Sequence, residues 1–148
     1  MRIGTQLGAA MIGLAALAGG CKKKEPPPPP VVVAPAPPPP VAVAGIEMGR
    51  AIGADKAVTA ATTVFGVRDT IFASIGTTGV SQASTLTAKW TLSTGQTVDS
   101  SSVAIAPTGP AMTEFHITNK KAWPVGKYRV AIMLDGKPAG EREFEVKK

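Results

Sequence analysis

The sequence predicts an all-β domain, a single sandwich of about seven short strands that follows a processed and proline-rich N-terminal segment. Apolar and polar residues alternate with a period of two along much of residues 46–148, as in strands with one buried face. Turn-forming residues interrupt this alternation repeatedly, which is typical of loops between short strands. Beyond the first 20 residues, no stretch keeps a helical period for ten residues. The observations therefore favour a sandwich over a helical or mixed fold.

The most regular strands form a C-terminal hairpin. Apolar residues alternate with others along residues 128–134, and Asp135-Gly136 follows, a pair that favours a two-residue turn. The chain then returns through Phe144 and Val146, with glutamates at the intervening positions. A similar alternation surrounds Trp90. Weaker strands are expected over residues 46–52, 58–65, 70–75, 96–106 and 112–117.

Residues 1–20 have the features of a signal peptide. Arg2 supplies a short positive region, and residues 3–18 are uncharged and mostly small or apolar. This stretch has the length of a signal-peptide core and is shorter than the roughly 20 residues of a spanning helix. Small residues then precede Cys21, the only cysteine of the chain. The segment Leu17-Ala18-Gly19-Gly20-Cys21 resembles the lipobox of bacterial lipoproteins.

This resemblance implies cleavage between Gly20 and Cys21, followed by attachment of a diacylglycerol and an acyl chain such as palmitate to Cys21. Several acyl chains give lasting membrane attachment. Lys22 stands where Asp would retain an enterobacterial-type lipoprotein in the inner membrane, so the resemblance implies the outer membrane. It departs from the pattern at Ala18, where a larger aliphatic residue is usual. Two alternatives stay open: a secretory peptide cut near Ala18, leaving a free thiol, and an uncleaved signal anchor.

Residues 21–45 are predicted to be a linker rich in Lys and Pro. Ten of the 14 prolines lie in residues 26–40, a composition that favours polyproline II over helix or central strand. At ~3.1 Å per residue this stalk spans roughly 45 Å. A spacer is the favoured interpretation, and a recognition motif for SH3-like grooves is the alternative. The lysines at 22–24 either meet lipid headgroups or only solubilise the stalk.

Three segments of the last third of the chain carry a resemblance: Trp123-Pro124-Val125-Gly126-Lys127-Tyr128-Arg129-Val130, Leu134-Asp135-Gly136 and Phe144-Glu145-Val146. They resemble the closing strands of immunoglobulin-like or fibronectin-III-like domains of bacterial envelope proteins. The resemblance implies an immunoglobulin-like sandwich over residues 46–148, after the predicted signal helix and disordered stalk, and it implies a fold rather than an activity. Since the chain has one cysteine, the disulfide-bonded version is excluded.

Charge and motifs favour no enzyme class. The formal net charge is +6, but residues 46–148 hold 12 Lys and Arg against 9 Asp and Glu, so no nucleic-acid partner is expected. No nucleotide-binding, calcium-loop or nucleophile-elbow motif is present. No metal or cofactor is expected beyond the lipid on Cys21. The glutamates at 141, 143 and 145 alternate as on a solvent face.

His116, the only histidine, is expected to lie exposed on a strand between two buried neighbours. A hydrolase triad would need His116 together with Asp69 or Asp99, and the sequence does not favour that arrangement. The hydrolase alternative therefore depends on a cleft that collects Asp69, Asp99 or Glu114.

The two tryptophans are the remaining binding candidates. Trp90 lies on the apolar face of its strand and is expected in the core. Trp123 is expected to be buried, with an exposed ligand anchor as the alternative, and Lys120 and Lys121 form a small basic spot beside it. The sequence thus predicts a membrane-anchored envelope lipoprotein whose domain binds a protein or glycan without catalysis. A structural subunit of an envelope or secretion complex is the main alternative.

Overall fold

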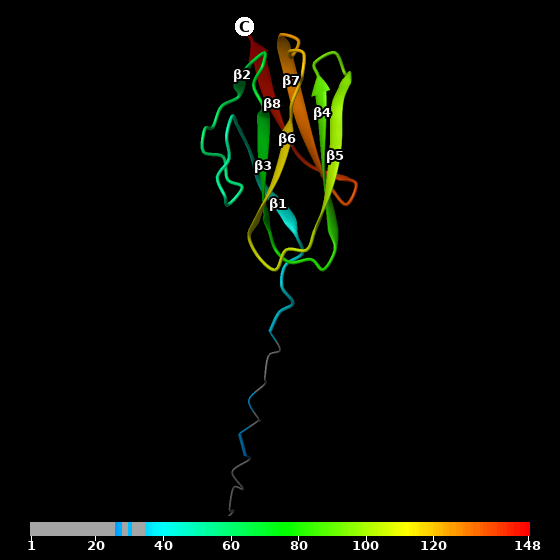
Figure 1. The fold of residues 1–148 in the computed structure, drawn as a ribbon. Coiled ribbons are helices and arrows are strands. Elements are labelled where there is room, and N and C mark those ends of the chain that lie inside the picture. The colour runs from blue at the N-terminus through cyan, green and yellow to red at the C-terminus, as the bar shows by residue number, and fades with distance from the viewer. Residues whose placement is uncertain (1–25, 28–29, 31–34) are drawn as a thin grey trace, which may run out of the picture. The chain divides into compact units, whose positions relative to one another are not determined.

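The computed structural model describes residues 26–27, 30 and 35–148, so the predicted signal peptide, Cys21 and part of the predicted linker lie outside the described residues. Residues 36–148 belong to one compact unit. The described part of the chain contains strands and loops and no helix, and its two sheets lie face to face (Figure 1). The predicted all-β sandwich is confirmed.

The sandwich has a three-stranded sheet of order β1-β3-β6 and a five-stranded sheet of order β2-β8-β7-β4-β5. Neighbouring strands are antiparallel, except that β2 runs parallel to β8. The strands are β1 (Ala42–Gly49), β2 (Val64–Gly66), β3 (Ile71–Thr78), β4 (Ser84–Leu92), β5 (Thr97–Ile105), β6 (Ala111–Ile117), β7 (Gly126–Leu134) and β8 (Lys137–Lys147).

The N-terminal third departs most from the expected strands. Strand β1 begins at Ala42, four residues earlier than the range 46–52 predicts. The expected strand over residues 58–65 is wrong for most of its length, because β2 has only three residues. The preceding segment instead folds onto the outer face of β3, where the Ser74 hydroxyl donates a hydrogen bond of 2.6 Å to the Lys56 carbonyl. Ser74 is fully buried by this contact.

The C-terminal hairpin is confirmed. Strand β7 pairs with β8 along its whole length. Asp135 and Gly136 join them with φ of 51° and 77°, the left-handed conformation that a type I′ turn requires at both positions.

The core lies between the inner faces of the sheets and is aromatic in one half. Phe144 stacks on Tyr128 at a centroid distance of 5.2 Å. The rings of Phe65 and Trp90 contact the Phe144 ring edge-on, at centroid distances of 5.6 and 5.9 Å. Trp90 is fully buried, so its predicted place in the core is confirmed. The other half of the core is aliphatic, with Ile75, Leu86 and Ile132 fully buried.

The strand directions define two ends of the domain. Residues 36–40 lead into β1 at one end, the stalk end, where the Val80 amide donates a hydrogen bond of 3.0 Å to the Pro39 carbonyl. The opposite end, the far end, lies at the top of Figure 1 beside the labelled C-terminus. The connections at this end cover residues 67–70, 93–96 and 118–125, and the first and last residues of the segment 50–63, whose middle lies against β3.

Candidate interaction surfaces

The predicted lipid attachment at Cys21 and the cleavage site between Gly20 and Cys21 lie outside the described residues. Both stay predictions. Within the part of the chain that is described, no helix is long and apolar enough to cross a membrane.

Trp123 joins two loops at the far end. Its backbone amide donates a hydrogen bond of 2.7 Å to the Val67 carbonyl, and its indole Nε1 donates one of 2.9 Å to the Asp69 carbonyl. The side chain is 5% exposed. Trp123 is therefore a core residue, as favoured from the sequence, and does not offer an exposed aromatic anchor to a ligand.

Tyr128 fixes the end of the same loop. Its hydroxyl donates a hydrogen bond of 2.7 Å to the Pro124 carbonyl, four residues upstream, as in the tyrosine corner of β-sandwiches. Burial raises the pKa of the Tyr128 hydroxyl above its usual 10.0, because the ionised form would lose its hydration. This contact shapes the backbone between Pro124 and β7.

Lys120 and Lys121, the predicted basic spot, are both exposed. Asn119 holds the turn that presents them, since its side chain accepts a hydrogen bond from the Lys121 amide at 3.0 Å and donates one to the Ala122 carbonyl at 2.9 Å. The sequence did not predict their neighbour. Arg68 is exposed and stands between the two carbonyls that Trp123 binds.

The one carboxylate in these two loops is already engaged. Asp69 accepts a hydrogen bond of 2.8 Å from the Gly66 amide and forms an ion pair of 2.7 Å with the Arg50 guanidinium. Arg50 also donates to the Val64 carbonyl at 3.0 Å. Asp69 therefore ties three segments together and carries no free charge toward solvent.

The residues considered for hydrolysis belong to different elements. His116 is exposed on β6, as predicted, and its Nδ1 lies 3.0 Å from a carboxylate oxygen of Glu114 on the same strand. Asp99 is on β5, in the other sheet, and Asp69 is bound as described above. The described residues contain no group of three or more His, Cys, Asp or Glu side chains able to hold a metal ion.

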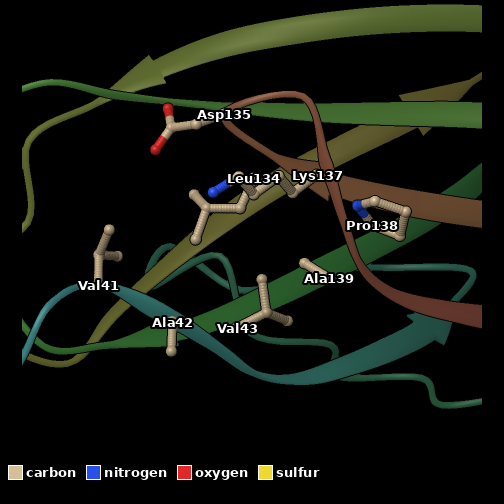
Figure 2. A pocket seen from close by; sticks show the side chains of 8 residues that line it. All are labelled: Val41, Ala42, Val43, Leu134, Asp135, Lys137, Pro138 and Ala139. Carbon is tan, nitrogen blue, oxygen red and sulfur yellow. The ribbon is translucent and has the colours of Figure 1, made fainter.

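A shallow groove of mixed polar and apolar lining lies between β1 and the β7–β8 hairpin. Its volume is about 400 Å³, and Figure 2 shows Val41 and Val43 on one side with Leu134 and Ala139 on the other. The groove continues along β1 toward Gly140, where the Ile46 side chain packs closely. It contains no convergent set of polar groups, which a specific small-molecule site would need.

Strand β5 is an open edge of the larger sheet. It pairs only with β4, carries one charge at Asp99 and has no proline. Val98 and Val103 are 37% and 39% exposed. Edge strands usually carry charges, prolines or a cover against pairing. Strand β5 lacks most of these features, so its backbone is accessible to an added strand.

No family model and no curated protein matches this chain. Solved structures with a similar fold include an immunoglobulin-like protein from Pseudomonas aeruginosa, which is 16% identical, with a TM-score of 0.47 over 74% of this chain and 98% of that one. A CARDB domain from Pyrococcus furiosus, crystallised with di-metal ions, is 14% identical, with a TM-score of 0.44 over 74% and 87%.

An alkylpurine DNA glycosylase from Pseudomonas fluorescens, bound to DNA, is 17% identical, with a TM-score of 0.48 over 73% of this chain. This chain spans only 30% of the length of that enzyme. The eight strands in two packed sheets carry the sandwich assignment by themselves. At these identities the likeness concerns the fold alone.

Proposed function

We propose that this chain is an outer-membrane lipoprotein, anchored through acyl chains on Cys21, whose immunoglobulin-like domain is a non-enzymatic binding module. One observation carries the proposal: the chain enters at the stalk end, and the loops with the exposed basic side chains lie at the opposite end. A tether at one end presents the other end to partners. The separation of His116, Asp69 and Asp99 supports a role without catalysis.

The anchor is tested by intact-mass spectrometry of the protein extracted from membranes, beside a Cys21→Ala variant. The expected mass corresponds to cleavage before Cys21 with a diacylglycerol and an acyl chain added, and the variant should stay unprocessed. An unlipidated protein cut near Ala18 would contradict the proposal. It would make the domain a secreted protein with a free thiol.

The open edge of β5 favours a second candidate, a structural subunit that adds its sheet to another chain. Crosslinking in intact envelopes followed by purification should then recover a stoichiometric complex. A Val103→Lys variant should lose it, because a lysine on the edge opposes strand addition. Val64→Lys is a matched control, since Val64 is also 39% exposed but lies on β2. Equal recovery with both variants would exclude pairing through β5.

A further inference from the structure

The net positive charge of the domain is concentrated at one corner of the far end. We define the basic corner as Arg50, Arg68, Lys120 and Lys121, which lie on or are bonded to the two loops that Trp123 connects, together with a single carboxylate, Asp69. Elsewhere in residues 46–148 eight cations face eight carboxylates. The corner therefore holds a charge of +3, the whole formal excess of the domain.

Two loops build this corner, and Trp123 connects them. The hydrogen bonds from its amide and its indole to Val67 and Asp69 hold Arg68 beside the loop that carries Lys120 and Lys121. Arg50 neutralises Asp69 at 2.7 Å. Within the described residues, no carboxylate lies within ion-pair distance of the other three cations. Their charges are free to meet an external anion.

We propose that the basic corner binds an anionic polysaccharide, a glycan chain with repeated acidic groups. This inference rests on the proposed function, because the tether at the stalk end is what would present the corner to such a polymer. Guanidinium groups bind oxyanions in a bidentate manner, and lysines add point charges. Closely placed cations without acidic neighbours produce a field that attracts a polyanion and depends on salt.

The same corner fits other partners less well. Its aromatic side chains, Trp123 and Tyr128, are 5% and 2% exposed, so they are not available to stack on nucleic-acid bases. Val125 and Val64, 56% and 39% exposed, are the exposed large apolar side chains near the corner, which is little for insertion into a bilayer or for an apolar protein interface. Charge dominates the recognition.

The test measures binding of the full-length mature protein, in nonionic detergent, to immobilised heparin as a densely anionic glycan. Neutral dextran, duplex DNA and anionic lipid vesicles serve as comparisons. The test variant combines Arg68→Gln, Lys120→Gln and Lys121→Gln. The matched control combines Lys89→Gln, Lys137→Gln and Arg142→Gln, which removes the same types of exposed charge elsewhere.

The corner variant should bind heparin about tenfold more weakly at low salt, and its affinity should fall less steeply with salt because fewer ionic contacts remain. The control should bind like the natural protein. Trp123→Phe should weaken binding with an unchanged salt dependence, because it keeps all the charges but removes the indole hydrogen bond to Asp69 and part of the packed ring. An equal loss in both triple variants would overturn the proposal, as would binding to dextran equal to that to heparin.

Tighter binding to DNA or to vesicles than to heparin would also overturn the proposal and assign the corner to that partner. The mass of the same preparation reports the state of Cys21. If Cys21 is unlipidated and the corner variant still loses heparin binding, the anchor proposal fails and the inference about the corner stands. If Cys21 is lipidated and the variant binds normally, the inference fails alone.

Discussion

The two ends of the domain are held together by different chemistry. At the far end aromatic and charged side chains add to the backbone hydrogen bonds between loops: Trp123 and Tyr128 bind loop carbonyls, and Arg50 binds Asp69. At the stalk end backbone amides and short polar side chains make the connections, and the Asp135 carboxylate accepts a hydrogen bond of 2.7 Å from the Thr85 amide. The amides of Val80 and Ser81 donate to the carbonyls of Pro39 and Pro107 at 3.0 and 2.9 Å, and the amide of Asp135 donates to Thr85.

This difference indicates which changes each end tolerates. The far end depends on the identity of a few aromatic and charged side chains. The stalk end depends on backbone conformation, so it accepts many side chains but is sensitive at residues with unusual φ. Five substitutions, at the two ends and in the sheets between them, test which contacts carry the stability.

The largest effect is expected from Phe144→Ala. The Phe144 ring contacts Phe65, Trp90 and Tyr128, so its removal leaves a cavity at the centre of the aromatic half. The free energy of unfolding should fall by about 3–5 kcal/mol, measured by urea denaturation. Val103→Ala, at an exposed edge position, is the control and should change it by about 0.5 kcal/mol or less. Similar losses for both would mean that the aromatic half does not dominate stability.

Gly79→Ala should lower the free energy of unfolding through a change at the stalk end. Gly79 has a φ of 86°, and a Cβ there would collide with the Pro40 carbonyl. Left-handed conformation alone costs roughly 1–2 kcal/mol for a residue with a Cβ, and the collision adds to it, giving about 3 kcal/mol.

Gly95→Ala separates these two contributions. Gly95 has a φ of 89° but open space around the position of a Cβ, so only the conformational cost of roughly 1–2 kcal/mol should appear. Equal losses for the two alanine variants in the same denaturation assay would show that the contact with Pro40 contributes nothing.

Tyr128→Phe tests the contribution of one side-chain hydrogen bond at the far end. It keeps the ring stacked on Phe144 and removes the hydrogen bond to Pro124, so the loss should be about 1 kcal/mol at neutral pH. Because burial raises the pKa of Tyr128, the unfolded chain releases this proton first as pH rises. The folded protein should therefore lose stability above about pH 10.

The variant lacks that ionisation, so its disadvantage should shrink between about pH 9 and pH 11. Chemical denaturation at the two pH values measures the difference. A gap that stays constant would indicate that the Tyr128 hydroxyl ionises equally in both states.

The smallest effect is expected from Arg129→Gln. Arg129 pairs with Glu141 and Glu143 at 3.4 and 3.1 Å on the outer face of the larger sheet, where all three side chains are about half exposed or more. Solvent screens such pairs, so the free energy of unfolding should change by about 0.5 kcal/mol or less. A loss above about 1 kcal/mol would mean that this face is more constrained than its exposure indicates.

The sequence predicts the C-terminal half of the fold well because local signals agree there. Alternation along β4 and β7, and the Asp135-Gly136 turn, each specify a strand or turn on their own. The segment before β2 has Ala, Val and Thr residues in no clear period, and its position depends on the distant contact between Lys56 and Ser74. No local pattern encodes that contact.

The candidate site was predicted in part for the same reason. Lys120 and Lys121 are adjacent to Trp123 in sequence, so the small basic spot could be recognised directly. Arg68 lies more than 50 residues earlier and joins them only through the hydrogen bonds of Trp123. The role of Asp69 as an acceptor for Arg50 likewise depends on folding, which brings three separate segments together.

The register of β1 has a mechanical consequence. Seven residue pairs join β1 to β3 in antiparallel order, from Ala42 with Thr78 to Gly49 with Phe72. The strand begins at the stalk end, so a pull on the preceding chain acts along the axis of β1. The hydrogen bonds of this ladder then bear tension together, in shear, and do not open one after another as in unzipping. A polymer bound at the far end and pulling on it would therefore load the β1–β3 ladder in shear.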